Sequence, residues 1–266
     1  KQKDDSTDGL TGERLVAATL SVVAHAGIKL TNLDAGTVSA ANGGSGDIEI
    51  IHTGVGVLTL STVPQSSQSG GRVIIGTTAA GLTVAGGVSV ASGSVTLTAA
   101  GDLKSEGAVS TAVARPIVMS ATGDLTLTGR ISSNAGAITL TAGRDVAALA
   151  DMDSVGGAIS IVSGRSIGMA SGKVINAGAG NVTIIAGTSV NLSRIVSTGL
   201  VTVTATGGAI SDQQAGEAAN INADKTILNS GAGVGLGDDI DLNVSTVSAR
   251  NSGTSGDITL HQVIGD

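Results

Sequence analysis

The feature that most constrains this chain is a short phrase that recurs about every 21 residues. In most copies a glycine stands shortly before an apolar residue, and a second apolar position follows two residues later. Two looser copies, at Ile117 and Ile221, lack the glycine. The first apolar position of each copy falls at Ile48, Val73, Val95, Ile117, Ile138, Ile159, Val182, Val201, Ile221, Ile240 and Ile258. Repeats of this length are typical of solenoids, in which a repeat buries its apolar side by stacking on its neighbours.

Each repeat contains three short strands. Ile138 and Leu140 alternate with threonines, which is the pattern of a strand with one buried face. A glycine turn follows, then a second strand at Val146, and a third segment like that at Ile131 closes the coil. Because three such strands in about 21 residues cannot close on themselves as hairpins, we expect successive coils to pair in parallel. The sequence thus predicts an all-β fold, a parallel β-helix (β-solenoid) of roughly twelve coils.

Two inward ladders follow from this alignment, and composition agrees with them. The first joins Val95, Ile117, Ile138, Ile159 and Val182, and the second joins Leu103, Leu125, Val146, Ile167 and Val190. Phe, Tyr, Trp and Cys are absent, so the core must be aliphatic, and 41 glycines supply the corners. Stacked β-branched side chains pack evenly at the strand spacing, whereas a large ring would interrupt the stack.

Charge and composition also exclude several partners. The net charge is −7 and no basic run is present, which argues against nucleic acid and anionic lipid as partners. No apolar run is long enough to span a membrane, so we expect no membrane insertion. The lack of cysteine rules out disulfides and thiolate metal sites.

The chain divides into a polar segment at residues 1–13, which we expect to be flexible, and a single solenoid at residues 14–266. The alternation in residues 15–23 favours a first strand over an amphipathic capping helix. The sequence also contains a repeat with a longer period: residues 37–48 recur at 246–258, an offset of about 210 residues. Gly-Asp precedes an apolar strand residue elsewhere in the chain, so we expect a further strand after Asp266.

The phrases Gly123-Asp-Leu-Thr-Leu-Thr-Gly and Gly136-Ala-Ile-Thr-Leu-Thr-Ala-Gly-Arg-Asp-Val resemble the repeats of filamentous haemagglutinin-type exoproteins. The two Thr-Val-Ser-Ala blocks, at Thr37 and Thr246, look like those of very large bacterial β-strand-repeat surface proteins. The resemblance covers about residues 20–266. It implies a right-handed β-helix, export across the envelope, and a role in adhesion or in a surface coat.

Two groups of aspartates are candidate metal ligands. Asp102, Asp124 and Asp145 each precede the second strand of their coil and should stack about 5 Å apart, where like charges favour a cation such as calcium. The alternative is that each aspartate caps its own turn. Another candidate calcium group is Asp238, Asp239 and Asp241, for which the alternative is an ordinary acidic corner.

Other polar residues recur in register. Thr96, Thr139, Ser160, Thr183 and Thr202 share one outward position, with a lapse at Met119 and at Asn222 and Asp241 beyond Thr202. This face could bind ice, a glycan or a crystalline polysaccharide. Alternatively, the threonines have a structural role only, because threonine has a high β propensity and ladders of hydroxyl groups stabilise sheets. Arg144 and Arg165, one coil apart, could grip an acidic glycan or pair with Asp145.

Catalysis finds little support in the sequence. His25, His52 and His261 have no partner at metal-ligand spacing, and no nucleophile motif accompanies them. A polysaccharide lyase or hydrolase is the least favoured alternative, because the chain has no aromatic platform for a sugar. We therefore expect a non-catalytic structural or adhesive segment of an extracellular surface or filament protein, without a cofactor other than calcium. Its expected partners are its own copies or neighbouring repeats, head to tail, and a glycan or cell-surface receptor.

Overall fold

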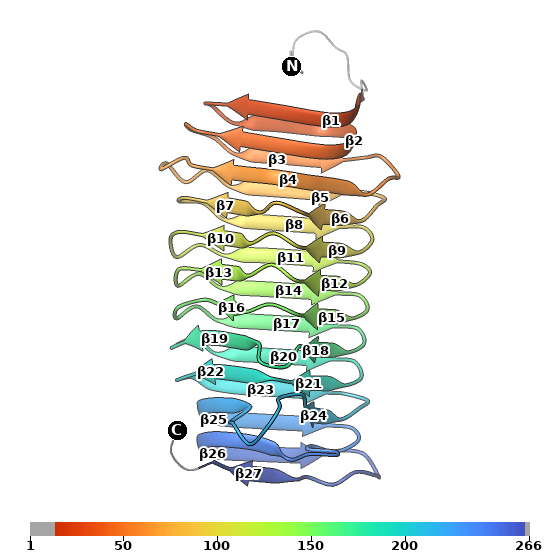
Figure 1. Ribbon diagram of the computed structural model, residues 1–266, viewed down its shortest axis with the longest axis vertical. Coiled ribbons are helices and arrows are strands. Elements are labelled where there is room, and N and C mark those ends of the chain that lie inside the picture. The colour runs from red at the N-terminus through yellow and green to blue at the C-terminus, as the bar shows by residue number, and fades with distance from the viewer. Residues whose placement is uncertain (1–13, 264–266) are drawn as a thin grey trace.

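The computed structural model describes residues 14–263, and they form an all-β parallel solenoid of about twelve turns with about 21 residues per turn. Figure 1 shows the coils stacked along the long axis, with β1 at one end and β27 at the other. The flexible segment predicted at residues 1–13 lies outside the described residues. No helix in residues 14–263 is long and apolar enough to cross a membrane.

Three strand positions per coil generate three faces. The strands of the first face are β3 (Ile48–His52), β5 (Val73–Thr77), β8 (Val95–Ala99), β11 (Ile117–Ala121), β14 (Ile138–Ala142), β17 (Ile159–Ser163), β20 (Val182–Ala186) and β23 (Leu200–Ala205). The strands of the second face are β6 (Leu82–Val84), β9 (Leu103–Ser105), β12 (Leu125–Leu127), β15 (Val146–Ala148), β18 (Ile167–Met169), β21 (Val190–Leu192) and β24 (Ile210–Asp212).

The third face and five longer strands complete the solenoid. The third face contains β7 (Val88–Val90), β10 (Val109–Thr111), β13 (Ile131–Ser133), β16 (Met152–Asp153), β19 (Val174–Gly178), β22 (Arg194–Ser197) and β27 (Leu260–Gln262). The longer strands, which run across corners, are β1 (Leu15–Ala24), β2 (Ile28–Asn42), β4 (Leu58–Gln65), β25 (Ile221–Ser230) and β26 (Ile240–Asn251). β1 confirms the strand expected near the start of the solenoid.

The strand registers confirm both predicted ladders. Ile138 pairs with Ile117 and Ile159, and Val146 pairs with Leu125 and Ile167, in each case in parallel. All ten ladder residues are at most 2% exposed and belong to one continuous aliphatic core. Strict alternation along the strands places these side chains inward and the threonines outward.

The predicted rhythm is wrong beyond Val201. The first face continues from Val201 to Thr226 and then to Val247, not to Ile221, Ile240 and Ile258. Ile221 instead continues the third face from Ile195, and Ile258 lies beside Val234 on the line of the second face. β25 and β26 pass from the third to the first face without a glycine break, so the next inward position lies further along the chain.

Glycine is required at the corners because coils approach closely there. A Cβ on Gly164 would lie 2.2 Å from the carbonyl oxygen of Gly143, and one on Gly187 would lie 2.1 Å from that of Gly164. Real Cβ atoms essentially never lie below about 3 Å from another heavy atom, so any larger residue at these corners would force the backbone to shift. The corner glycines therefore set the spacing that stacks the ladders.

The two copies of the longer repeat form the same corner at different places on the solenoid. Asn42 Nδ2 donates to the carbonyl oxygens of Ser45 and Gly46, both at 3.0 Å, and Asn251 Nδ2 donates in the same way to Ser255 and Gly256. Yet Asn42 ends the third face, beside Gln65, whereas Asn251 ends the first face, beside Ser230. The repeated phrase thus specifies a local turn, and the coil position of that turn differs between the copies.

Candidate functional site

The predicted aspartates Asp102, Asp124 and Asp145 lie in one column at the corner between the first and second faces. Asp102 Oδ1 accepts the backbone N–H of Asp124 at 2.9 Å, and Asp124 Oδ1 accepts that of Asp145 at 3.1 Å. Asp145 Oδ1 in turn accepts the N–H of Ser166 at 2.8 Å. Each carboxylate therefore binds the backbone of the next coil, whereas the sequence suggested that it would cap its own turn.

The same bond recurs at four other corners where Asp or Asn stands in front of a strand. Its acceptor and donor residues are Asp47 and Arg72 at 2.7 Å, Asp151 and Val174 at 3.0 Å, Asn181 and Leu200 at 2.9 Å, and Asn220 and Asp241 at 2.8 Å. Asparagine serves as well as aspartate, so the bond needs an oxygen acceptor rather than a charge. These side chains connect one coil to the next.

Arg144 supplies a positive charge to the aspartate column. Its Nη2 donates to Asp102 Oδ1 at 2.8 Å and to Asp124 Oδ2 at 2.9 Å, while its Nε donates to Asp124 Oδ1 at 3.0 Å. The hydrogen bonds from Arg144 to Asp124 are the main reason that the pKa of Asp124 is lowered. The sequence suggested Asp145 as the partner of Arg144, but its hydrogen bonds go to the two preceding aspartates. Calcium binding by this column stays a prediction.

The predicted hydroxyl column on the first face is present but was misaligned at one position. Thr139 pairs with Ser160, Ser160 with Thr183, and Thr183 with Thr202, and all of them are half-exposed. Between Thr96 and Thr139 the outward residue is Val118, not Met119; Met119 faces inward and is 0% exposed.

The ends of that column also differ from the prediction. Thr96 is preceded by Ile74 and Thr202 is followed by Ile227, so neither Asn222 nor Asp241 belongs to it. A second column, two residues along each strand, carries hydroxyls at Thr98, Ser120, Thr141 and Thr204 and is interrupted by Val162 and Ile185. The first face thus presents two parallel rows of hydroxyl groups mixed with aliphatic side chains.

The acidic group predicted near β26 is only partly brought together. Asp238 is exposed, and its carboxylate accepts the N–H of Asp239. Asp239 and Asp241 instead lie with Glu217 and His261, and one ligand atom from each of the four is within 4.8 Å of all the others. His261 Nδ1 is 2.8 Å from Asp241 Oδ1 and 3.9 Å from Glu217 Oε2. We call these four residues the His261 cluster.

Asp241 is unusual because it is a buried carboxylate at an outward position. It lies between the inward residues Ile240 and Leu242, yet it is only 2% exposed. The connection between β24 and β25, residues 213–220, brings Glu217 to it and contributes Asn220, whose Oδ1 accepts the N–H of Asp241. Asn220 also donates to Asp212, and burial is the main cause of the raised pKa of Asp212.

Spacing along the sequence misses the His261 cluster because its members meet across coils. Asp241 and His261 are register partners on adjacent strands, and Glu217 comes from an irregular connection. His261 has no partner at metal-ligand spacing along the sequence, but it gains one across coils, and its bond to Asp241 is the main reason that the pKa of His261 is raised. A correct coil register over residues 226–261 would have placed Asp241 beside His261, but not Glu217.

The other two histidines lie far from this cluster. His52 is fully buried; its Nε2 lies 2.9 Å from the carbonyl oxygen of Gly56, and its Nδ1 accepts the N–H of Ala35 at 3.4 Å. His25 is exposed, near the corner glycines 43 and 44. His52 thus has the contacts of a core residue.

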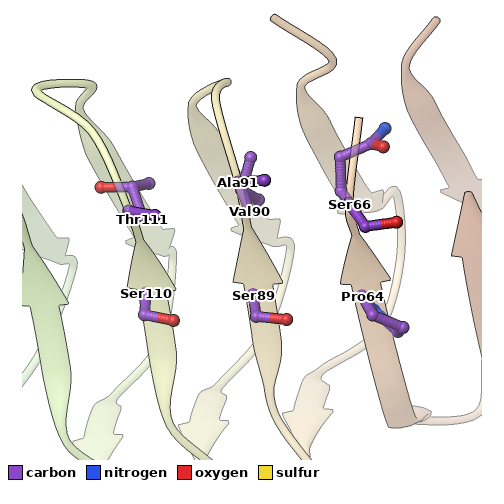
Figure 2. Close-up of a pocket in the computed structure, with 9 residues that line it drawn as sticks. Pro64, Ser66, Ser89, Val90, Ala91, Ser110 and Thr111 are labelled. Carbon is purple, nitrogen blue, oxygen red and sulfur yellow. The ribbon is translucent and has the colours of Figure 1, made fainter. Parts of the chain in front are cut away.

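A shallow groove of about 300 Å³ crosses three neighbouring coils on the third face. Figure 2 shows that its walls come from three stacked strand ends, with Ser89 and Ser110 in line with Pro64. The lining side chains are small apart from Gln65, and none of them is titratable: Pro64, Gln65, Ser66, Ser89, Val90, Ala91, Ser110, Thr111 and Ala112. The groove could therefore accommodate a ligand by its shape, but its lining contains no acid, base or nucleophile that is activated for catalysis.

Comparison of the chain with models of known protein families, with curated proteins and with solved structures finds no match.

Proposed function

We propose that this chain is a non-catalytic structural and adhesive segment of an exported bacterial surface protein or extracellular filament. The observation that carries the proposal is the unbroken parallel stack, from β1 to β27, around a single aliphatic core. Such a rod can act as a spacer, and it can present binding surfaces along its length, as other repeat proteins do on their extended faces. The resemblance to filamentous haemagglutinin-type repeats points in the same direction.

Its proposed partners are neighbouring repeats or further copies of the chain, head to tail, and a glycan or receptor outside the cell. The same parallel pairing that joins coils within the chain can join a terminal coil to the next unit, and such heterologous contacts can run on into filaments. Adhesion would use the outward side chains and corners, since the core faces inward.

Electron microscopy and light scattering of the purified chain over a rising concentration series test the assembly part of this proposal. We expect rods that lengthen by addition at their ends. Strictly monomeric particles at high concentration would exclude filament formation. In parallel, beads coated with the chain should adhere to cells or to an array of glycans, and the absence of binding to both would remove the adhesive role.

The enzymatic alternative has its own test. Incubation of the chain with a panel of acidic and neutral polysaccharides should release no new reducing ends and no unsaturated products. Cleavage of any of them would overturn the non-catalytic assignment.

The two hydroxyl columns of the first face favour a second candidate, a binding surface for a regular array such as ice or a crystalline polysaccharide. The columns repeat at the strand spacing of about 4.8 Å, and in-register pairing keeps their hydroxyl groups in line. Replacing Thr139 and Thr183 with lysine would disrupt the array without touching the core. Ice shaping or cellulose retention by the wild type, lost in this variant, would support the candidate; no effect by the wild type would exclude it.

A further inference from the structure

We propose that Glu217, Asp239, Asp241 and His261 form a binding site for one divalent transition-metal ion of the Zn²⁺ class. The site is independent of the structural and adhesive role proposed above, because it concerns one irregular coil rather than the stack as a whole.

The first argument is the geometry of the donor atoms. Four side chains each bring one ligand atom within 4.8 Å of the other three. Metal–ligand distances of about 2.0–2.1 Å for imidazole nitrogen and carboxylate oxygen imply about 3.3 Å between neighbouring ligands in a tetrahedral site. The separations from His261 Nδ1, 2.8 Å to Asp241 and 3.9 Å to Glu217, lie on either side of that value. Three of the side chains are at least partly exposed and are free to adjust.

The second argument is electrostatic. Asp241 is 2% exposed, and its carboxylate lies close to those of Asp239 and Glu217. A buried carboxylate is costly unless a positive charge compensates it, and neighbouring carboxylates raise that cost. Within residues 14–263, His261 is the only base that forms an ion pair with this group. One imidazole cannot balance three carboxylates, whereas a divalent cation with the neutral imidazole as ligand leaves a small net charge.

The third argument is the support around the buried ligand. Asn220, which is fully buried, accepts the backbone N–H of Asp241 and donates to the carbonyl oxygen of Ser193 and to Asp212. This network fixes the strand position of Asp241 before any ion binds. Outer hydrogen bonds of this kind hold the ligands of protein metal sites in place. Elsewhere on the solenoid the outward positions of the first-face hydroxyl column are half-exposed, so a buried charge held by a buried amide marks this coil as different.

The donor set selects the class of ion. An imidazole nitrogen with carboxylate oxygens suits zinc and related transition metals, whereas calcium prefers six to eight oxygen ligands. The Asp102 column offers a contrast, since its carboxylates already bind backbone N–H groups and the guanidinium of Arg144. Within residues 14–263 no guanidinium forms an ion pair with the His261 cluster, and the imidazole of His261 can bind a metal ion in its neutral form.

Isothermal titration calorimetry of the whole 266-residue chain with ZnCl₂ alone, and separately with CaCl₂ alone, tests the proposal. The wild type should bind one Zn²⁺ per chain, more tightly than Ca²⁺. His261→Ala and Glu217→Gln should each weaken Zn²⁺ binding at least about 10-fold, since even outer-sphere changes cost metal sites 10–100-fold. Both residues are exposed, so neither change should prevent folding.

His25→Ala is the matched control, because it removes an exposed histidine outside the cluster and should leave Zn²⁺ affinity unchanged. Zn²⁺ should also raise the melting temperature of the wild type and of His25→Ala but not of His261→Ala, because a ligand that binds only the folded state stabilises it. The proposal is overturned if the wild type binds no Zn²⁺, if both cluster variants bind Zn²⁺ as the wild type does, or if Ca²⁺ binds more tightly than Zn²⁺.

Discussion

The middle coils and the last coils of this solenoid have the same core chemistry but differ in regularity. From β8 to β23 every coil has three separate strands, with steps of 19 to 23 residues between register partners such as Val182 and Val201 or Ile159 and Val182. In the last coils β25 and β26 run across a corner, and a connection at residues 213–220 carries Glu217 and Asn220 to Asp241.

The difference lies in the corner residues. In the middle coils Gly157 and Gly180 precede the first face, and close contacts with the previous coil leave no room for a Cβ at either residue. The corresponding stretch of β25 is Ala223-Asp224-Lys225, which has no glycine, and the strand continues through it. In β25 the strand therefore runs through the corner, and the next inward position of the first face falls at Thr226 instead of at Ile221.

The largest difference in stability between the middle coils and the last coils should come from substitutions in the core. Leu140→Ala, in a middle coil, removes a fully buried side chain between two others and should lower the free energy of unfolding by about 2–5 kcal/mol. Leu260→Ala, in the last strand, removes a partly exposed side chain and should cost less than about 1 kcal/mol. Urea denaturation followed by circular dichroism measures both. Equal losses would mean that the last strand is packed as firmly as the middle.

Corner glycines give the next largest effect. A Cβ on Gly164 would meet the carbonyl oxygen of Gly143 at 2.2 Å, whereas one on Gly168 would meet nothing within 4 Å. Gly164→Ala should destabilise by about 1–3 kcal/mol, as overpacking does, while Gly168→Ala should stay within about 0.5 kcal/mol of the wild type. The same denaturation measurement compares the pair. If the two variants behave alike, the corners are looser than described.

One substitution in the last coils, in β25, is expected to increase the stability of the protein. Thr226 occupies an inward position between Val201 and Val247, is 1% exposed, and its hydroxyl has no hydrogen-bond partner. Thr226→Val should therefore stabilise the protein by about 1 kcal/mol, because the cost of burying an unpaired hydroxyl disappears. Thr202→Val, at a half-exposed outward position, is the control and should change stability by less than about 0.5 kcal/mol. A loss of stability in Thr226→Val would show that the hydroxyl is paired.

The smallest effect concerns the aspartate column. Asp124 has a lowered pKa in the folded state, chiefly because of Arg144, so its charge stabilises the fold above the ordinary carboxyl pKa and this stabilisation fades as the pH falls through the lowered value. Asp124→Asn should cost less than about 1 kcal/mol at neutral pH, because the pair is exposed, and nothing at strongly acidic pH. Denaturation midpoints across a pH series measure this, and a difference that grows towards acid would contradict it.

The sequence predicts the middle of the molecule well and its last part poorly, for a physical reason. Ile138, Ile159 and Val182 are inward neighbours as expected, since glycine corners and strict alternation leave one register. The inward position predicted for Ile117 already implies that Val118 faces outward, so the assignment of Met119 to the hydroxyl column was an alignment error of one residue. The right-handed sense of the helix stays a prediction.

The candidate sites follow the same division. The Asp102 column and the Thr139 column were found because they repeat with the coil. The His261 cluster was not, because Glu217 comes from a connection without a repeat and because the glycines before Ile240 and Ile258 belong to other corners than the phrase suggested. The partner bond from each Asp or Asn to the next coil was missed because a side-chain oxygen can equally well cap its own turn.

The most direct test of the parallel stack is a distance between two spin labels on its first face. The chain has no cysteine, so Thr96→Cys and Thr202→Cys introduce the only labelling sites. Five strand steps separate these outward residues, which at about 4.8 Å per step predicts a narrow distribution of distances near 24 Å in pulsed electron paramagnetic resonance. A broad distribution, or a distance that does not correspond to five steps, would contradict the account.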